Sequence, residues 1–270
     1  MLTASSFSIF AQGISIVPLI EAPNRTMNAS LFASANPEAV KKYMPSGSAP
    51  ASMSSFALIA GDDTVLFDTA LGGKAWIKEL TGVKPENVKL ILITHFHGDH
   101  IGGLLKGEER RFPHAQVLCS LPEYESGQNE PAIVKIRSAY GQDFKTFEFD
   151  EEVFTSPLVK IKAIDAVGHT PGHTAFLVEP QKGSPQKESA KQEKVKLLII
   201  GDLLHAAALQ FPVPEACASF DADKDKAIAS RKRILDLAVQ EELIICGMHL
   251  PPPCIGTVKK EGSGYAFELK

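Results

Sequence analysis

The stretch ILITHFHGDHIGG, residues 91–103, decides the fold. It opens as an apolar, β-branched run typical of a buried strand, and His95, His97, Asp99 and His100 follow within six residues. Glycines among them allow the backbone to turn tightly. Histidines in a protein core usually occur singly, each with a hydrogen-bond partner. Four ligand-type residues in six positions at a strand end therefore predict a metal site.

The residue types narrow the choice of metal. Imidazole nitrogens and carboxylate oxygens suit zinc, and iron, manganese and cobalt are compatible with the same donors. One catalytic ion takes three protein ligands and keeps an open position. Four ligands at this spacing cannot all reach one ion, so we expect a second ion or roles outside the coordination shell. Further ligands would come from the remaining histidines and strand-end aspartates, which are His114, His169, His173, His205, His249, Asp165 and Asp202.

The motif GHTPGH, residues 168–173, contains a proline and two glycines and is therefore not helical. His169 and His173 cannot stack on one face, as two histidines four apart on a helix would. From the residues alone, the motif does not say which of the two binds a metal ion, or whether either does.

The composition is that of an ordinary soluble globular chain. The 270 residues carry a net charge of −4 and a hydrophobic share of 44%, so no basic field favours nucleic acid. No apolar run is long enough to span a membrane. The four cysteines lie far apart without a C-x-x-C pair, and we expect them to be buried as small hydrophobic residues. The expected partner is a small-molecule substrate.

Apolar strands alternate with helices along the chain, which predicts an α/β architecture with sheets covered by helices. We find no convincing linker and expect a single domain, residues 1–270. Its N-terminal part, about residues 1–54, is predicted to be a hairpin turning at Gln12-Gly13 and then a polar excursion, residues 22–54, with little regular pattern. Such excursions serve as lids, interface arms or mobile loops. The charged segment 181–194 is predicted to be a solvated loop.

The sequence leaves the compartment open. The first residues, MLTASSFSIFAQG, are apolar with a small-residue end, but they lack the basic region of a secretory signal. We expect a periplasmic or secreted protein if a signal preceded Met1, and a cytoplasmic protein otherwise. The apolar N-terminal segment is also the one feature that points to a homodimer.

The stretch THFHGDH resembles the H-x-H-x-D-H signature of the metallo-β-lactamase superfamily. Other motifs of that family are matched in order by TVLFDTA (64–70), GHTPGH, IIGDLL (199–204) and CGMHLPPP (246–253). The resemblance covers essentially the whole chain. It implies a four-layer αβ/βα sandwich, the metallo-β-lactamase fold, with the site at one edge of two facing sheets.

The same resemblance implies a role for each motif residue. Asp68 would be a structural carboxylate, and His173 would orient a ligand or brace its turn. Two divalent ions are implied, with zinc as the expected metal and Asp202 bridging them. The remaining implied ligands are His95, His97 and His169 for one ion, and Asp99, His100 and His249 for the other.

The C-terminal third resembles the methyl parathion hydrolases and their quorum-quenching lactonase relatives. Flavodiiron proteins need a glutamate where this chain has His97, and too few residues separate the fourth and fifth motifs for an RNA-processing nuclease. The stretch after His100 lacks a tryptophan, so the aromatic pocket wall of the phosphotriesterases is not expected. His205 stands where lactonases carry a substrate-contacting tyrosine. It is interpreted either as a substrate contact or proton carrier, or as a packing residue.

These observations predict a metal-dependent hydrolase. Two ions lower the pKa of a bridging water, and the resulting hydroxide attacks a lactone, an ester or a phosphotriester. Asp99 is the candidate for steering the proton, in addition to its implied role as a ligand. Hydrolysis of a thioester or a β-lactam on the same fold is the alternative enzymatic reading. The third hypothesis is a non-catalytic member of the family that only binds a ligand.

Overall fold

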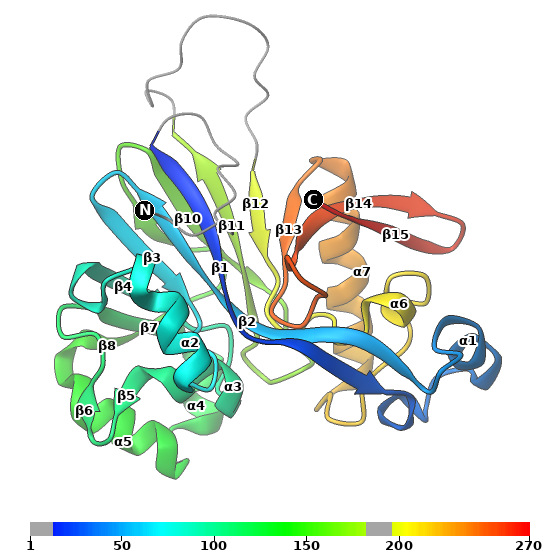
Figure 1. Cartoon of the computed structure of the whole chain (residues 1–270), viewed down its shortest axis with the longest axis horizontal. Coiled ribbons are helices and arrows are strands. Elements are labelled where there is room, and N and C mark those ends of the chain that lie inside the picture. Colours follow the sequence, from blue (N-terminus) through cyan, green and yellow to red (C-terminus); the bar gives the residue numbers. More distant parts are fainter. Residues whose placement is uncertain (1–12, 182–195) are drawn as a thin grey trace, which may run out of the picture.

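Two large β-sheets face each other in the computed structural model of the chain, which describes residues 13–181 and 196–270 (Figure 1). The first sheet has the strand order β1-β2-β3-β4-β7-β8, and the second has the order β15-β14-β13-β12-β11-β10-β9. The strands of the first sheet are β1 (Ile14–Asn28), β2 (Ser48–Ala60), β3 (Asp63–Phe67), β4 (Val88–Leu92), β7 (Gln116–Ser120) and β8 (Phe144–Phe147). Those of the second are β9 (Glu152–Thr155), β10 (Val159–Asp165), β11 (Thr174–Pro180), β12 (Leu197–Ile199), β13 (Ile244–Cys246), β14 (Ile255–Glu261) and β15 (Gly264–Leu269). A small ribbon pairs β5 (Leu105–Lys106) with β6 (Glu109–Arg110).

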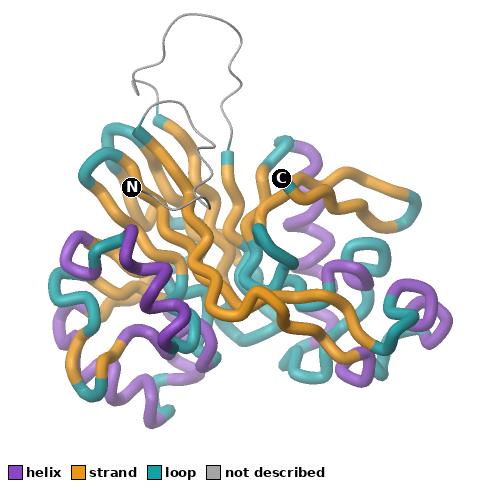
Figure 2. The backbone as a smooth tube through the Cα atoms, viewed as in Figure 1, coloured by secondary structure: helices purple, strands orange, loops and turns teal. Residues whose placement is uncertain are grey.

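Helices cover the outer faces of both sheets, as Figure 2 shows in purple. Those beside the first sheet are α2 (Lys74–Glu79), α3 (Gly98–Ile101), α4 (Leu121–Gly127) and α5 (Pro131–Tyr140). The second sheet carries α6 (Ala207–Gln210) and α7 (Lys224–Gln240), while α1 (Pro37–Tyr43) lies at the far end of β1 and β2 (Figure 1). The order helix, sheet, sheet, helix confirms the predicted four-layer sandwich. Within the described residues, no helix is both long and apolar enough to cross a membrane.

Strand alternation divides the apolar side chains between two cores. On β3, Val65 and Phe67 enter the core between the sheets, while Leu66 packs under the helices of the first sheet. The Phe67 ring meets Phe176 of the second sheet, with 5.6 Å between ring centroids. Each fully buried side chain of this size stabilises the fold by roughly 1.5–3 kcal/mol. Trp76 of α2 is also fully buried, and its Nε1–H donates to Ser55 of β2 over 2.8 Å.

The prediction of an irregular excursion over residues 22–54 was wrong. β1 pairs with β2 as far as Asn28, which faces Ser48, although the register shifts between Ile20 and Ala22 and again before Arg25. We call residues 22–54 the arm. Met27, Phe32, Met44, Ala49 and Ala51 of the arm are buried in a third apolar cluster with residues of the 206–218 segment. The two bulges and the many small or polar residues hid this strand from pattern reasoning.

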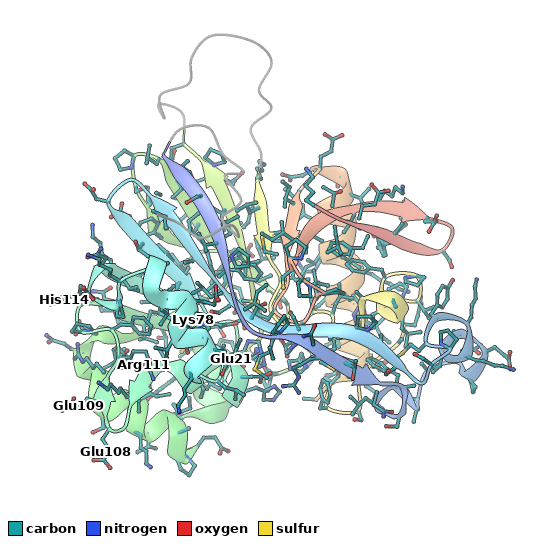
Figure 3. All side chains as sticks on the ribbon, viewed as in Figure 1. Glu21, Lys78, Glu108, Glu109, Arg111 and His114 are labelled. Atoms are coloured by element: carbon teal, nitrogen blue, oxygen red, sulfur yellow. The ribbon has the colours of Figure 1, made fainter. Side chains whose placement is uncertain are left out.

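Glu21 fixes the place where β1 bends into the arm. Its carboxylate accepts hydrogen bonds from the backbone N–H groups of Leu71, Gly72 and Gly73, at 2.9, 3.2 and 2.8 Å. Figure 3 labels this residue beside α2, near the bend of β1. The contact ties the arm to the loop between β3 and α2.

Several other predictions can be compared with the structure. β12 is limited to Leu197–Ile199 and β13 to Ile244–Cys246, and turns that carry polar side chains follow both. All four cysteines are buried, as predicted. The predicted turn at Gln12-Gly13 and the predicted loop at 181–194 lie almost entirely outside the described residues.

Candidate metal centre

Seven side chains predicted from the sequence meet at one edge of the sandwich. We call them the cup; they are His95, His97, Asp99, His100, His169, Asp202 and His249. They follow the carboxyl ends of β4, β10, β12 and β13, or lie on the short helix α3 that begins after β4. Because β12 and β13 are parallel neighbours, their ends bring Asp202 and His249 to the same edge.

Four of the seven residues form a first group of metal-binding atoms. The ligand atoms of His95, His97, His169 and Asp202 all lie within 4.8 Å of one another. Nδ1 of His97 is 2.9 Å from Nε2 of His95 and 3.0 Å from Nε2 of His169. Three nitrogens therefore converge on one point, with Oδ2 of Asp202 lying 3.3 Å from Nε2 of His169.

The other three residues form a second group. The ligand atoms of Asp99, His100 and His249 also lie within 4.8 Å of one another. Oδ1 of Asp202 is 3.0 Å from Nε2 of His100 and 3.2 Å from Nε2 of His249. The two oxygens of this single carboxylate thus face the two groups separately.

The rest of the protein fixes which ring nitrogen of each buried histidine faces the cup. In four of them Nδ1 is occupied by a neighbouring oxygen, so Nε2 is left pointing inward. The Nδ1 partners are Thr94 Oγ1 for His95 at 3.0 Å, Asp68 Oδ2 for His100 at 2.7 Å, Asp221 Oδ1 for His169 at 2.9 Å and the Ser52 carbonyl for His249 at 2.9 Å. A ring held in this way presents a lone pair to a cation.

A further observation supports the fit of the cup residues to divalent ions. Among the described side chains, Nε2 of His100, Oδ1 of Asp202 and Nδ1 of His205 are buried without a hydrogen-bond partner. Buried polar atoms are rarely left unpaired in native proteins. Two of these three belong to the cup, and a cation between the groups would satisfy both.

Asp68 is a structural carboxylate behind the cup, as the family resemblance of its motif implied. Its carboxylate accepts the N–H and the Oγ1–H of Thr94, both at 2.8 Å, and the Nδ1–H of His100. It is completely buried, and this burial raises its pKa despite these bonds. Asp68 thus links β3 to both His95 and His100 through a hydrogen-bond network.

His173 lies behind the cup and in none of the ligand groups. Its Nδ1–H donates to the carbonyl of Ala166, and its Nε2 accepts the backbone N–H of Asp202, both at 2.9 Å. Burial lowers its pKa to about 3. The ring leaves no room for a larger residue at Gly201, where an added Cβ would lie 2.5 Å from Nε2. In GHTPGH, His169 therefore faces the cup and His173 holds Asp202 in place.

Asp221 is a functional residue that our sequence reasoning missed. It lies in the SFDAD stretch before α7, and its Oδ2 accepts the backbone N–H of Ala218 at 2.9 Å while Oδ1 holds His169. The buried guanidinium of Arg231 is 3.7 Å away. Burial alone would raise its pKa, but the His169 hydrogen bond and nearby cationic groups hold it below the usual value. Only tertiary contact across 52 residues reveals this pairing.

His205 lies inside the site. Its Nε2–H donates to Oδ2 of Asp202 over 3.0 Å, and its ring centroid is 4.7 Å from that of Phe220. His114, by contrast, is exposed, and Figure 3 labels it at the left edge of the molecule. Although His114 is one of the remaining histidines, it takes no part in the cup.

A cavity of about 290 Å³ opens above the cup. Its floor consists of polar residues, and its walls come from the arm and from the segment before α7. The lining residues are Arg25, Met27, Leu31, His97, Asp99, Asp202, His205, Phe220 and His249. Phe220 provides an aromatic wall that the sequence did not lead us to expect. No local sequence pattern marks Arg25, Met27 and Leu31 as cavity residues, because their position depends on the course of β1.

Comparison with known proteins agrees with this geometry. The family model described as the metallo-beta-lactamase superfamily matches residues 50–183. An N-acyl homoserine lactonase from Bacillus sp is 27% identical over 169 residues, which are 63% of this chain and 58% of the lactonase. A hydroxyacylglutathione hydrolase from Prochlorococcus marinus (strain NATL1A) is 30% identical over 145 residues, which are 53% of this chain and 46% of that enzyme. The matched part thus spans about half to three-fifths of these relatives.

Solved structures share the fold over nearly the whole chain. The hydrolase AbOPH of the beta lactamase superfamily superposes with a TM-score of 0.81 at 24% identity, covering 100% of this chain and 99% of its own. AidC, a dizinc quorum-quenching lactonase solved with a product, superposes with a TM-score of 0.82 at 21% identity, covering 98% of this chain and 97% of its own.

Proposed function

We propose that this chain, which carries a metallo-beta-lactamase superfamily domain, is a hydrolase that binds two divalent metal ions and cleaves a lactone or an ester. The observation that carries the proposal is the position of Asp202. Each of its oxygens faces a separate group of nitrogen and carboxylate donors. One carboxylate between two such groups has the arrangement of a bridging ligand.

The proposed ligands follow the two groups. His95, His97 and His169 would hold one ion and Asp99, His100 and His249 the other, with Asp202 shared between them. Zinc is the expected metal, since its preferred donors are imidazole and carboxylate. Two such ions supply Lewis acidity and lower the pKa of water toward neutrality.

Two residues are proposed to act on the substrate itself. Asp99 lines the cavity with its side chain 26% exposed, and one of its oxygens lies 3.5 Å from Nε2 of His249. In this position it would carry a proton to the leaving group. His205 keeps Nδ1 unpaired and lines the same cavity, so this nitrogen can contact a substrate oxygen.

The cavity favours a substrate with an apolar part. Met27, Leu31 and Phe220 form an apolar wall beside the polar floor. Lactones and carboxylic esters suit this combination, and one relative is named as an N-acyl homoserine lactonase. A thioester is the second candidate, because a hydroxyacylglutathione hydrolase is among the relatives. Phosphotriesters remain a third class to be tested.

Metal analysis with a small substrate panel tests the proposal. The metal-loaded protein should contain two equivalents of divalent metal and hydrolyse an acyl-homoserine lactone or an aryl ester, while S-lactoylglutathione, a paraoxon-type triester and nitrocefin test the other three substrate classes. His97→Ala and Asp202→Ala should abolish turnover with an unchanged circular dichroism spectrum. His114→Ala is the matched control and should keep full activity. A protein that holds two metals but cleaves none of the five would contradict the proposal.

A further inference from the structure

Arg25 is the one cationic side chain among the residues that line the cavity above the cup. It comes from the arm, it is exposed, and among the described residues it has no hydrogen-bond or ion-pair partner. The only acids in the same lining are Asp99 and Asp202, which belong to the cup. A guanidinium without a counter-ion at the rim of a reaction cavity is therefore open to a ligand.

The course of β1 places the side chain of Arg25 in the cavity lining. Residues two apart on a strand point to the same face, and both Arg25 and Met27 line the cavity. A register shift immediately precedes Arg25, and shifts of this kind commonly redirect side chains beside active sites. The residues opposite are Ala51 and Ala49, so no cross-strand acid competes for the guanidinium.

The chemistry of the guanidinium selects an anion. It is always charged near neutral pH, and its planar fork matches the two oxygens of a carboxylate or a phosphate. The apolar residues Met27, Leu31 and Phe220 would bind the body of the molecule. The cavity thus offers a polar floor, an apolar wall and a cationic rim.

We propose that Arg25 binds an anionic group of the substrate, a carboxylate or a phosphate, so that the protein prefers charged esters or lactones over neutral ones. This inference rests on the proposed hydrolase function and specifies its substrate class. Neutral lactones and neutral triesters would then be secondary substrates.

Pairs of esters that differ only in charge test the proposal. One pair is 4-acetoxybenzoate and 4-acetoxybenzamide, with the charge on the leaving group, and 4-acetoxyphenylphosphonate extends it to a phosphate-like anion. A second pair is phenyl hydrogen adipate and phenyl adipamate, with the charge on the acyl side. The measured quantity is the ratio of kcat/KM for the anion to that for its amide. Because each ratio is compared between enzymes, the intrinsic reactivity of the esters cancels.

In the metal-loaded Arg25→Met variant, the ratio should fall about 10- to 100-fold for at least one pair, as expected for the loss of charge-assisted hydrogen bonds. The ratio for Arg25→Lys should lie between those of the wild type and Arg25→Met, since lysine keeps the charge but lacks the planar fork of the guanidinium. Lys41→Met removes an exposed cation from α1, outside the cavity lining, and should keep the wild-type ratio. Salt should lower the ratio in the wild type more than in Arg25→Met.

Two results would overturn the inference, and they differ in meaning. If the neutral amides are cleaved and every ratio in Arg25→Met stays within twofold of wild type, Arg25 does not select an anion, while the hydrolase function stands. If the metal-loaded wild type cleaves none of these esters nor the earlier panel, the hydrolase function fails and the inference fails with it.

Discussion

Replacing Asp221 by asparagine tests whether the residue behind His169 controls metal binding. The carboxylate makes two hydrogen bonds at once, accepting the His169 ring N–H at one oxygen and the Ala218 N–H at the other, each at 2.9 Å. Asparagine has almost the same shape but only one acceptor oxygen. In either orientation of the amide, its NH₂ group must face a donor.

The expected loss follows from that geometry. Removing the carboxylate behind a metal-binding histidine typically weakens metal affinity about 10- to 100-fold, which corresponds to about 1.4–2.7 kcal/mol. The same change leaves a buried donor unpaired, which lowers the free energy of unfolding of the metal-free protein by about 1–3 kcal/mol. We therefore expect both quantities to fall.

Competition with a chromophoric chelator measures the metal affinity, and urea unfolding measures the stability of the metal-free protein. Asp223→Asn is the matched control, because Asp223 caps α7 through the Lys226 N–H and asparagine is an equally good cap. It should change neither quantity appreciably. The reasoning is refuted if Asp221→Asn loses stability but binds metal as tightly as the wild type.

Three further outcomes are expected. Gly201→Ala should destabilise the protein by more than about 1 kcal/mol in urea unfolding and reduce its metal content, because Gly201 has φ +50° and a Cβ there meets His173; normal metal content would contradict this. Trp76→Ala should cost about 3–5 kcal/mol of unfolding free energy, whereas Trp76→Phe should cost clearly less. Metal removal by a chelator should lower the melting temperature, and added zinc should restore it, because ligands that bind only the folded state stabilise it; an unchanged melting temperature would argue against a bound metal.

The cup could be predicted because its chemistry is concentrated in the sequence. His95, His97, Asp99 and His100 are nearly contiguous and follow a strongly apolar strand, so their proximity does not depend on knowing the fold. His169, Asp202 and His249 were placed through the family resemblance rather than by local physics. The structure brings them to the same edge because three different strands of the second sheet end there.

The walls of the cavity could not be predicted in the same way. Arg25 stands in a polar stretch whose alternation is broken by two register shifts, and nothing local marks it as part of a site. Phe220 and Asp221 precede α7 and contact His169, which lies about 50 residues earlier in the chain. Such residues are set by contacts between segments far apart in the chain, which periodicity and propensity do not report.

The structure separates the residues that would hold metal from those that would select a substrate. The buried histidines of the cup are fixed by oxygens of β2, Thr94, Asp68 and Asp221, so they depend on the sandwich itself. The arm packs in an apolar cluster that includes Met27, Ala49 and Leu209, whereas its β2 side also reaches the cup through the Ser52 carbonyl. Because the Arg25 side chain has no hydrogen bond or ion pair with a residue of the cup, its substitution should alter substrate preference and leave metal affinity largely intact. Arg25→Met and Asp221→Asn probe the two sets separately, and a large effect of the first on metal affinity would show that they are coupled.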